Sequence, residues 1–291
     1  MNYLLQQLLN ALQLGSIYAL IALGYTMVYG ILTMINFAHG DLFMIGAFLC
    51  FLAGVTLHLP FVPTLLLSMA GAALLGATIE RLAYKPLRNA PRVSPIITAL
   101  GVGLFLENFT LALNPYPKHI APLLDTRVWT VGGVSISSLQ VMIVALSILL
   151  MLLLDVYVRR TMTGMAMRAI SWDRTNASLM GLPVDRIISA TFAIGAGLGG
   201  AAGVMYALAY PVIDPYMGIM VGWKAFISAV VGGIGSIHGA MLGGFLLGAV
   251  EVLVAAYFPS TFRDFVAFSL LLALLVGRPY GILGKPRPQK V

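Results

Sequence analysis

The stretch Arg159–Arg186, RRTMTGMAMRAISWDRTNASLMGLPVDR, is the longest polar interruption in a chain that is otherwise mostly apolar. It contains five arginines and two aspartates, and hydrophobic runs long enough to cross a membrane precede and follow it. Asp173 stands where a helix N-cap would stand, Gly181 suits the left-handed position after a helix end, and Pro183 follows where a helix has just stopped. The pattern predicts short helices that lie against one membrane surface.

The simplest alternative is a basic connecting loop, because loops on the cytoplasmic side of a membrane are rich in Lys and Arg. A connection between neighbouring helices usually needs only about two to eight residues. This stretch is much longer and carries its own capping signals. We therefore interpret residues 159–186 as a cytoplasmic docking segment within a single transmembrane domain that covers residues 1–291.

The composition places the chain in the membrane. Of its 291 residues, 60% are hydrophobic and only 9% are charged, and the mean hydropathy is +0.96, whereas soluble domains average about 25% charged residues. Apolar runs of about 20 residues recur, which predicts an all-α polytopic membrane protein. The formal charge of +7 resides in short loops, so membrane topology explains it without a nucleic-acid partner. No phosphate-binding or metalloprotease motif is evident, and we predict no catalytic residue, metal ligand or bound cofactor.

The apolar runs predict about eight transmembrane helices, one of them broken or re-entrant, over approximate residues 4–29, 36–57, 61–83, 94–113, 138–158, 187–210, 223–257 and 265–276. The segments at 114–137 and 211–222 are expected to be outside loops. Thirteen basic residues fall on the predicted inner side, at 81–92, 159–186 and 278–290, and four fall outside, at Lys118, Arg127, Lys224 and Arg263. This bias predicts a periplasmic N-terminus and a cytoplasmic C-terminus.

Two apolar stretches are interrupted in a way that a lipid-facing helix would not be. The first break, at Asn36–Asp41, places polar side chains at membrane depth, where they persist only when protein or water surrounds them. We expect Asn36 and His39, with Tyr25 and Tyr29 nearby, to line a translocation pathway. The alternative is that His39 and Asp41 cap a helix or bond to neighbours at the membrane edge. The second break, GGIGSIHGA at 232–240, predicts an interrupted passage.

Glu107, with Asn108 beside it, lies inside a predicted span. A buried carboxylate in a membrane is costly and marks a functional candidate, so both residues join the candidate pathway. We favour a position at the outer end of the helix, where Glu107 would face water. Glu80 and Glu251, near helix ends, are expected to be solvated or paired with Lys or Arg, and His238 is expected to fix the second break.

Glycines and alanines form a face at 194–203, IGAGLGGAAG, which predicts close packing against another helix. Residues 36–48 are also weakly similar to residues 237–245, and each segment follows a break. Such a match is typical of transporters built from two repeats, although two short glycine-rich segments can also match by chance.

Three blocks carry a resemblance that covers essentially the whole chain: GSIYALIALGYTMVYGILTMINFAHGDLFMIGAF at 15–48, AISWDRTNASLMGLPVDRIISATFAIGAGLGGAAGVMY at 169–206 and AVVGGIGSIHGAMLGGFLLGAVE at 229–251. They resemble the permease subunits of branched-chain amino acid ABC importers, of the LivH type. The resemblance implies an inner-membrane half-channel that pairs with a second, LivM-like permease. Two cytoplasmic ATPase subunits would bind ATP and Mg²⁺, and a periplasmic binding protein would deliver Leu, Ile or Val.

The same resemblance places the family's cytoplasmic coupling segment on residues 159–186. Many ABC permeases have there an E-A-A sequence followed by Gly, and the nearest match here, Asn176–Gly181, lacks the glutamate and is more compact. We expect the segment to dock on an ATPase subunit. Because its sequence departs from the E-A-A pattern, that pattern alone does not fix which of its residues make the contacts. The residues expected to contact an ATPase subunit are Asp173, Arg174, Ala177, Ser178 and Gly181, with Arg168 in support.

Other functions remain open at this stage. Related permeases carry urea, short amides or other amino acids, and the chain can pair with itself or with a paralogue. A self-sufficient transporter coupled to an ion gradient would require paired carboxylates or an acid–base relay at mid-membrane. The sequence shows only an isolated Glu107 and an ambiguous Asp41. An intramembrane enzyme would require a nucleophile–base pair or a metal cluster, and no such pattern is evident.

Overall fold

The structure is a computed structural model that describes residues 2–88, 90–91 and 93–284. Within these residues, seven helical stretches are long and apolar enough to cross a membrane. They are α1 (Asn2–Leu32), α2 with the π-helical turn η1 (His39–Cys50 and Phe51–Thr56), α3 with the turns η2 and η3 (Phe61–Ile79, Glu80–Tyr84 and Lys85–Leu87), α4 (Val93–Leu113), α5 (Ser138–Arg160), α8 (Val184–Ala209) and α10 (Ile237–Tyr257).

The remaining elements are shorter. In the part of the chain that the structure describes, four further helices are α6 (Met162–Trp172), α7 (Arg174–Leu179), α9 (Met217–Gly232) and α11 (Phe262–Gly277). The same part contains four short strands, β1 (Lys118–His119), β2 (Val128–Val131), β3 (Val134–Ser137) and β4 (Val212–Ile213), which form two antiparallel pairs, β1 with β4 and β2 with β3. The predicted loop at 114–137 therefore contains a hairpin, and Gly132 and Gly133 supply the positive φ angles of its turn.

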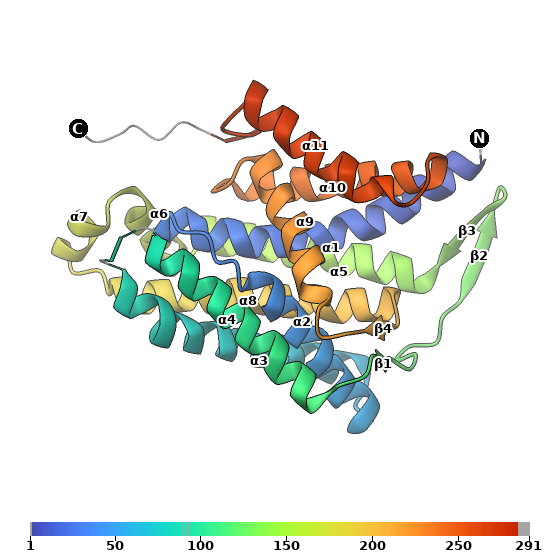
Figure 1. Ribbon diagram of the computed structural model, residues 1–291, viewed down its shortest axis with the longest axis horizontal. Helices are drawn as coiled ribbons and strands as arrows, with labels where there is room; N and C mark the ends of the chain where they lie inside the picture. Colours follow the sequence, from blue (N-terminus) through green and yellow to red (C-terminus); the bar gives the residue numbers. More distant parts are fainter. Residues whose placement is uncertain (1, 89, 92, 285–291) are drawn as a thin grey trace.

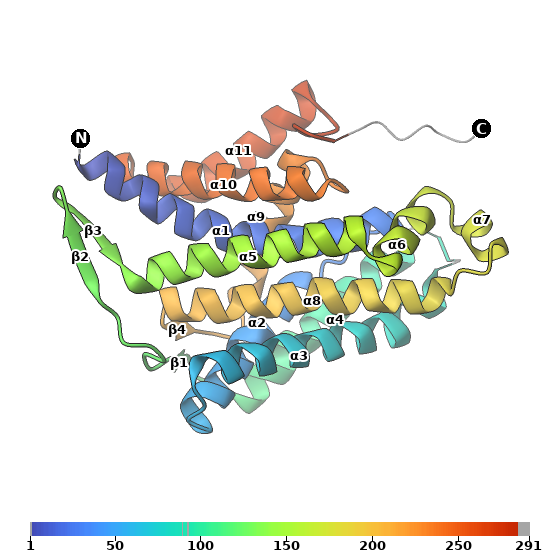
Figure 2. The same cartoon turned by 180° about the vertical axis from the view of Figure 1, so that it is seen from behind.

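The helices form a bundle along one long axis (Figure 1). Helices α1, α5, α8 and α10 run along this axis, α3 and α4 lie on one side, and α10 and α11 lie on the other. Helix α9 crosses the bundle obliquely (Figures 1 and 2). The α6–α7 pair lies at one end, here called the coupling end, and the β2–β3 hairpin lies at the other, here called the hairpin end.

The central helices are α1 and α8. In the 18-residue apolar stretch of each helix, 83% and 78% of the residues are buried inside the protein, compared with 22% in α5. Small residues explain this close packing, because helices in a membrane associate where side chains let the backbones approach. A Cβ atom on Gly46 would meet the backbone of Gly200, and one on Gly203 would meet the carbonyl of Phe43. The predicted packing face at 194–203 is confirmed, and it contacts α1, α2 and α3.

Helix α1 also packs closely on α10 through glycine residues. A Cβ atom on Gly244 would meet the backbone of Ala19, and one on Gly248 would meet Gly15. The two segments that are similar in sequence each begin a helix, α2 at His39 and α10 at Ile237.

The predicted spans agree with the observed helices, with one correction. Residues 211–222 were expected to form an outside turn, but the chain is helical from Met217 onward. Lys224, counted with the outside loops, lies within α9. The second break lies where the sequence predicts it, at 232–240, because α9 ends at Gly232 and Gly233 adopts φ +111°. Of the basic residues expected on the inner side, Arg92 and those after residue 284 lie outside the described residues.

The α2–α8 crossing yields a test of this packing. The change Gly203→Ala places a methyl group against the backbone of α2, and overpacking of this kind costs about 1–3 kcal/mol. We expect a lower unfolding temperature for the purified protein in detergent. Gly101→Ala in α4 is the matched control, since a Cβ there meets no atom within 4 Å, and Ala favours a helix over Gly by about 1 kcal/mol. Equal unfolding temperatures for the two variants would contradict the packing argument.

Candidate functional site

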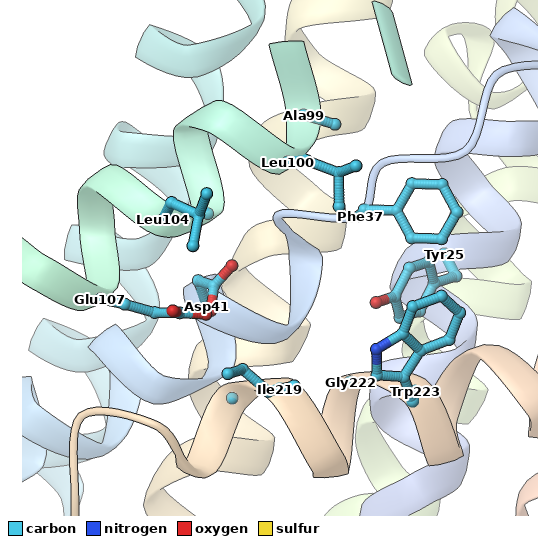
Figure 3. Close-up of a pocket in the computed structure, with 12 residues that line it drawn as sticks. Tyr25, Phe37, Asp41, Ala99, Leu100, Leu104, Glu107, Ile219, Gly222 and Trp223 are labelled. Atoms are coloured by element: carbon cyan, nitrogen blue, oxygen red, sulfur yellow. The ribbon is translucent and has the colours of Figure 1, made fainter. Parts of the chain in front are cut away.

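A pocket of about 190 Å³ opens beside the break between α1 and α2 (Figure 3). The chain leaves α1 at Leu32, runs non-helically through residues 33–38, and enters α2 at His39. On α4 the lining residues run from Ala99 to Glu107, the middle of a helix long enough to cross a membrane. The lining residues are Tyr25, Phe37, Asp41, Ala99, Leu100, Gly103, Leu104, Glu107, Gly218, Ile219, Gly222 and Trp223.

Glycines bring the walls of this pocket together. Gly218 and Gly222, four residues apart on α9, face Gly40 at the start of α2, and a Cβ on any of the three would meet the backbone of another. On the opposite side, a Cβ on Gly103 would lie 2.5 Å from a carboxylate oxygen of Asp41. The G-x-x-x-G spacing at 218–222 is a known signal for close helix contact, but it lies in the segment that the sequence predicts to be an outside turn, so the contact was not expected.

Asp41 and Glu107 meet in the pocket. They are only 4% and 5% exposed, and their carboxyl groups point toward each other within hydrogen-bonding contact. The expectation that Glu107 faces water at a helix end is therefore wrong, because α4 packs on α2 through Gly103 and turns Glu107 inward. Within the described part of the chain, none of the residues lining the pocket is a Lys or an Arg.

Hydrogen-bond donors lie across the pocket from these carboxyl groups. The hydroxyl group of Tyr25 points into the pocket (Figure 3), and a phenol hydroxyl can donate a hydrogen bond. The indole nitrogen of Trp223 faces the pocket (Figure 3). Phe37 and Trp223 are in ring contact, with centroids 5.4 Å apart.

The other residues expected on the pathway lie around the pocket or apart from it. His39 is buried behind Tyr25, with ring centroids 4.7 Å apart; it does not cap α2, and its Nε2 atom has no hydrogen-bond partner in the described structure. Asn36 is also buried, and its Oδ1 atom accepts a 2.7 Å hydrogen bond from the hydroxyl of Tyr84. Tyr29 does not line the pocket.

Asn108 is exposed, and its amide donates to the carbonyl of Leu104 on its own helix at 2.7 Å. The pocket therefore brings together Tyr25 and Glu107 of the six residues proposed from sequence. Beyond Asp41, it adds apolar and aromatic residues that the polar interruptions could not reveal: Phe37, Leu100, Leu104, Ile219 and Trp223.

A second buried ion cluster lies near the hairpin end. The ammonium group of Lys224 lies 2.8 Å from Glu251 and 2.9 Å from Asp264, so it joins α9, α10 and α11. The hydroxyl of Tyr18 donates to Glu251 at 2.8 Å. This confirms the expectation that Glu251 is paired with a basic residue. Near the coupling end, His238 contacts Arg159 at 3.1 Å and Asp155 at 3.5 Å, so it joins the start of α10 to α5.

The coupling end carries the predicted short helices. Asp173 is the N-cap of α7, and its side chain accepts from the backbone N–H of Asn176 at 3.1 Å. Gly181 adopts φ +81°, the left-handed conformation expected after the helix end. Arg168 on α6 donates to the carbonyls of Val158 and Arg159, where it supports the end of α5.

The exposed face of this segment, however, is largely apolar. Ala177 is buried, so its side chain offers little surface, whereas Ser178 and Gly181 are exposed. Trp172, Leu179 and Met180 are 75%, 81% and 83% exposed, although they lie outside the membrane-spanning helices. Large exposed apolar side chains mark a surface that interacts with another protein or with the membrane. We call these three residues the apolar patch.

A partly buried ionic network connects this end to the rest of the bundle: Glu80 and Arg88 are buried, whereas the side chains of Lys85 and Asp185 are 49% and 56% exposed. Arg88 pairs with both Glu80 and Asp185, and Lys85 pairs with Asp185 at 2.7 Å. Ser189 on α8 also donates to the fully buried Glu80, which is therefore paired as expected. The network joins the turns after α3 to the first turns of α8. Tyr84, in the same π-helical turn as Glu80, continues it to Asn36 in the broken segment.

These features define a class of protein. A polytopic helical bundle has a broken helix, a mid-span pocket with polar and apolar walls, and exposed apolar side chains at one end, features that suit a transport permease. The family described as "Branched-chain amino acid transport system / permease component" matches residues 7–275. The chain belongs to this family, and it is a multi-pass inner-membrane transport subunit.

Similar proteins support the same assignment. The chain is 45% identical over 303 residues to the high-affinity branched-chain amino acid transport system permease protein LivH of Escherichia coli (strain K12), covering 99% of this chain and 98% of that protein. It is 44% identical over 300 residues to BraD of Pseudomonas aeruginosa, with the same coverage. It is 27% identical to a probable LivH of Methanocaldococcus jannaschii, covering 94% of this chain and 91% of that protein. No solved structure matches the chain.

The contribution of the ion pairs around Glu80 to the stability of the protein can be tested by mutation. The change Arg88→Met leaves the fully buried Glu80 without its cation, and breaking a buried pair from one side costs about 3–5 kcal/mol. We expect a clear fall in unfolding temperature in detergent. The double change Glu80→Gln with Arg88→Met removes both charges and should restore much of the loss.

Arg127→Met, at an exposed arginine of the hairpin end, is the matched control and should leave the unfolding temperature unchanged. If Arg88→Met unfolds at the same temperature as this control, the buried pair does not stabilise the coupling end.

Proposed function

We propose that this chain forms half of the membrane pathway of an ATP-driven importer for branched-chain amino acids, Leu, Ile and Val. The family match over residues 7–275 carries this proposal. The similar proteins of Escherichia coli and Pseudomonas aeruginosa, named as high-affinity branched-chain amino acid permeases, support the substrate class. Permeases of this family for urea, amides or other amino acids remain the alternative within the same class.

The proposed assembly contains a second, LivM-like permease, two ATPase subunits and a periplasmic binding protein. ATP and Mg²⁺ would bind to the ATPase subunits. The apolar patch at Trp172, Leu179 and Met180 supports docking at the coupling end, because such side chains are unfavourable in water when unpartnered. In this assembly the coupling end faces the cytoplasm, the N-terminus is periplasmic and the C-terminus is cytoplasmic.

The ionic network supplies a physical route for coupling. Helix α7 leads through Gly181 into α8, whose first turn carries Asp185. Asp185 is paired with Lys85 and Arg88, so displacement of α7 by an ATPase pulls on the end of α3 as well as on α8. Tyr84 then transmits the displacement to the broken segment at Asn36, beside the pocket.

One observation favours a second candidate function. A transporter coupled to an ion gradient would require paired carboxyl groups at mid-membrane, and Asp41 and Glu107 form such a pair. ATP-driven import is the better-supported function, because the family match covers most of the chain and the apolar patch at the coupling end would suit a partner subunit.

Co-purification discriminates between the two functions. The tagged chain is purified from its native membrane, its partners are identified by mass spectrometry, and ATP hydrolysis is measured in lipid discs. A second permease, two ATPase subunits and leucine-stimulated hydrolysis with the binding protein are the expected result. A chain that purifies alone and still accumulates leucine along an ion gradient would overturn the importer proposal.

The docking surface can be tested directly. The change Leu179→Ser removes an apolar contact from an 81% exposed position, so the permease should still fold. Loss of one central contact costs about 1–2 kcal/mol, and we expect about tenfold less ATPase retained on the purified permease and weaker leucine-stimulated hydrolysis.

Leu124→Ser, at an exposed leucine near the hairpin end, is the matched control and should retain the ATPase subunits. Equal retention for both variants would show that the apolar patch is not the docking surface.

A further inference from the structure

We propose that the pocket between the α1–α2 break, α4 and α9 binds the transported substrate as a zwitterionic α-amino acid with an apolar side chain. The proposal rests on the importer function and assigns one part of the pocket to each part of the substrate. Acceptors lie on one side, donors lie on the other, and apolar side chains form the walls between them (Figure 3).

The carboxyl groups of Asp41 and Glu107 bind the ammonium group. Two carboxylates side by side in a site of low dielectric constant repel each other, so a pair that retains one proton carries a single negative charge. One ammonium group neutralises that charge. The substrate is the only cation required, because no Lys or Arg lines the described pocket to compete for the pair.

The hydroxyl of Tyr25 and the indole N–H of Trp223 bind the substrate carboxylate. The Tyr25 hydroxyl points into the cavity from α1 and can donate its proton to an acceptor there. The Trp223 nitrogen faces the cavity from α9. Hydrogen bonds to an ionised acceptor are among the strong ones, and the contact between Gly40 and Gly222 holds α9, which carries Trp223, against the start of α2.

The apolar walls of the pocket select the side chain of the substrate. Leu100 and Leu104 from α4, Ile219 from α9 and Phe37 from the break offer only apolar atoms to the cavity. A charged or amide side chain placed against them would lose its hydrogen bonds with water without replacement. The volume of about 190 Å³ is below the range of about 300–1,000 Å³ that is typical of sites for drug-sized ligands, which suits a single small amino acid.

Photoaffinity labelling tests this assignment. The complete complex, with its partner permease and ATPase subunits in lipid discs and without binding protein, is irradiated with photo-leucine, which carries a diazirine in its side chain. Peptide mass spectrometry should find the label on the apolar walls, at Leu100, Leu104, Ile219 or Phe37. Competition with leucine, with 4-methylpentanoate (which lacks the ammonium group) and with leucinamide (which lacks the carboxylate) should rank leucine first. Each analogue should compete at least about tenfold less well.

Variants locate the two ends of the substrate. Glu107→Gln preserves the shape but removes the charge, and it should weaken leucine competition by about tenfold while 4-methylpentanoate is little affected. Trp223→Phe removes the N–H and should reduce the advantage of leucine over leucinamide. The matched controls, Asp125→Asn and Trp129→Phe at exposed positions of the hairpin end, should leave the ranking unchanged.

The outcomes separate this proposal from the importer function. ATP-dependent leucine uptake by proteoliposomes with binding protein tests the function alone. If uptake occurs but the label falls outside the pocket, or 4-methylpentanoate competes as well as leucine, the pocket assignment is overturned and the importer stands. If the pocket is labelled with the expected ranking but uptake requires no ATP, the importer proposal is overturned and the amino-acid pocket stands.

Discussion

A broken helix inside a membrane must be enclosed by its own protein, because lipid cannot satisfy the freed backbone N–H and C=O groups. The bundle meets this constraint with glycine. Gly218 and Gly222 bring α9 against Gly40, and Gly103 brings α4 against Asp41, so the break between α1 and α2 is covered on both sides. The close approach of α4 and α9 to the break also forms the pocket. The carboxyl groups of Asp41 and Glu107 therefore lie at mid-span because of the way the break is enclosed.

The coupling end obeys a related constraint. Glu80 has no access to water, and a carboxylate in that environment persists when it is paired and hydrogen-bonded. Arg88 and Ser189 satisfy it, and Arg88 reaches on to Asp185. The requirement to neutralise one buried charge thus ties the turns after α3 to the start of α8. The short helix α7, which leads into that start, is thereby linked to two membrane helices.

Local signals in the sequence predicted most of the elements. Asp173 marks a helix start because its side chain bonds a backbone N–H only three residues away, and Gly181 marks a helix end because left-handed backbone favours glycine. The glycine-rich face at 194–203 predicted close packing for a similar reason. The segment 211–222 was misjudged because a short oblique helix such as α9 has neither the length nor the charges that identify a span.

The sequence by itself determined a polytopic helical bundle with two breaks, a polar segment of short capped helices at 159–186 and membership of a permease family, because hydrophobicity, capping and glycine spacing act over a few neighbouring residues. Only the tertiary structure decided that Glu107 meets Asp41, that Trp223 faces them and that Asn36 bonds Tyr84. These partners are far apart in the chain, and their meeting depends on which faces of α2, α4 and α9 turn toward each other. No local pattern encodes that rotation.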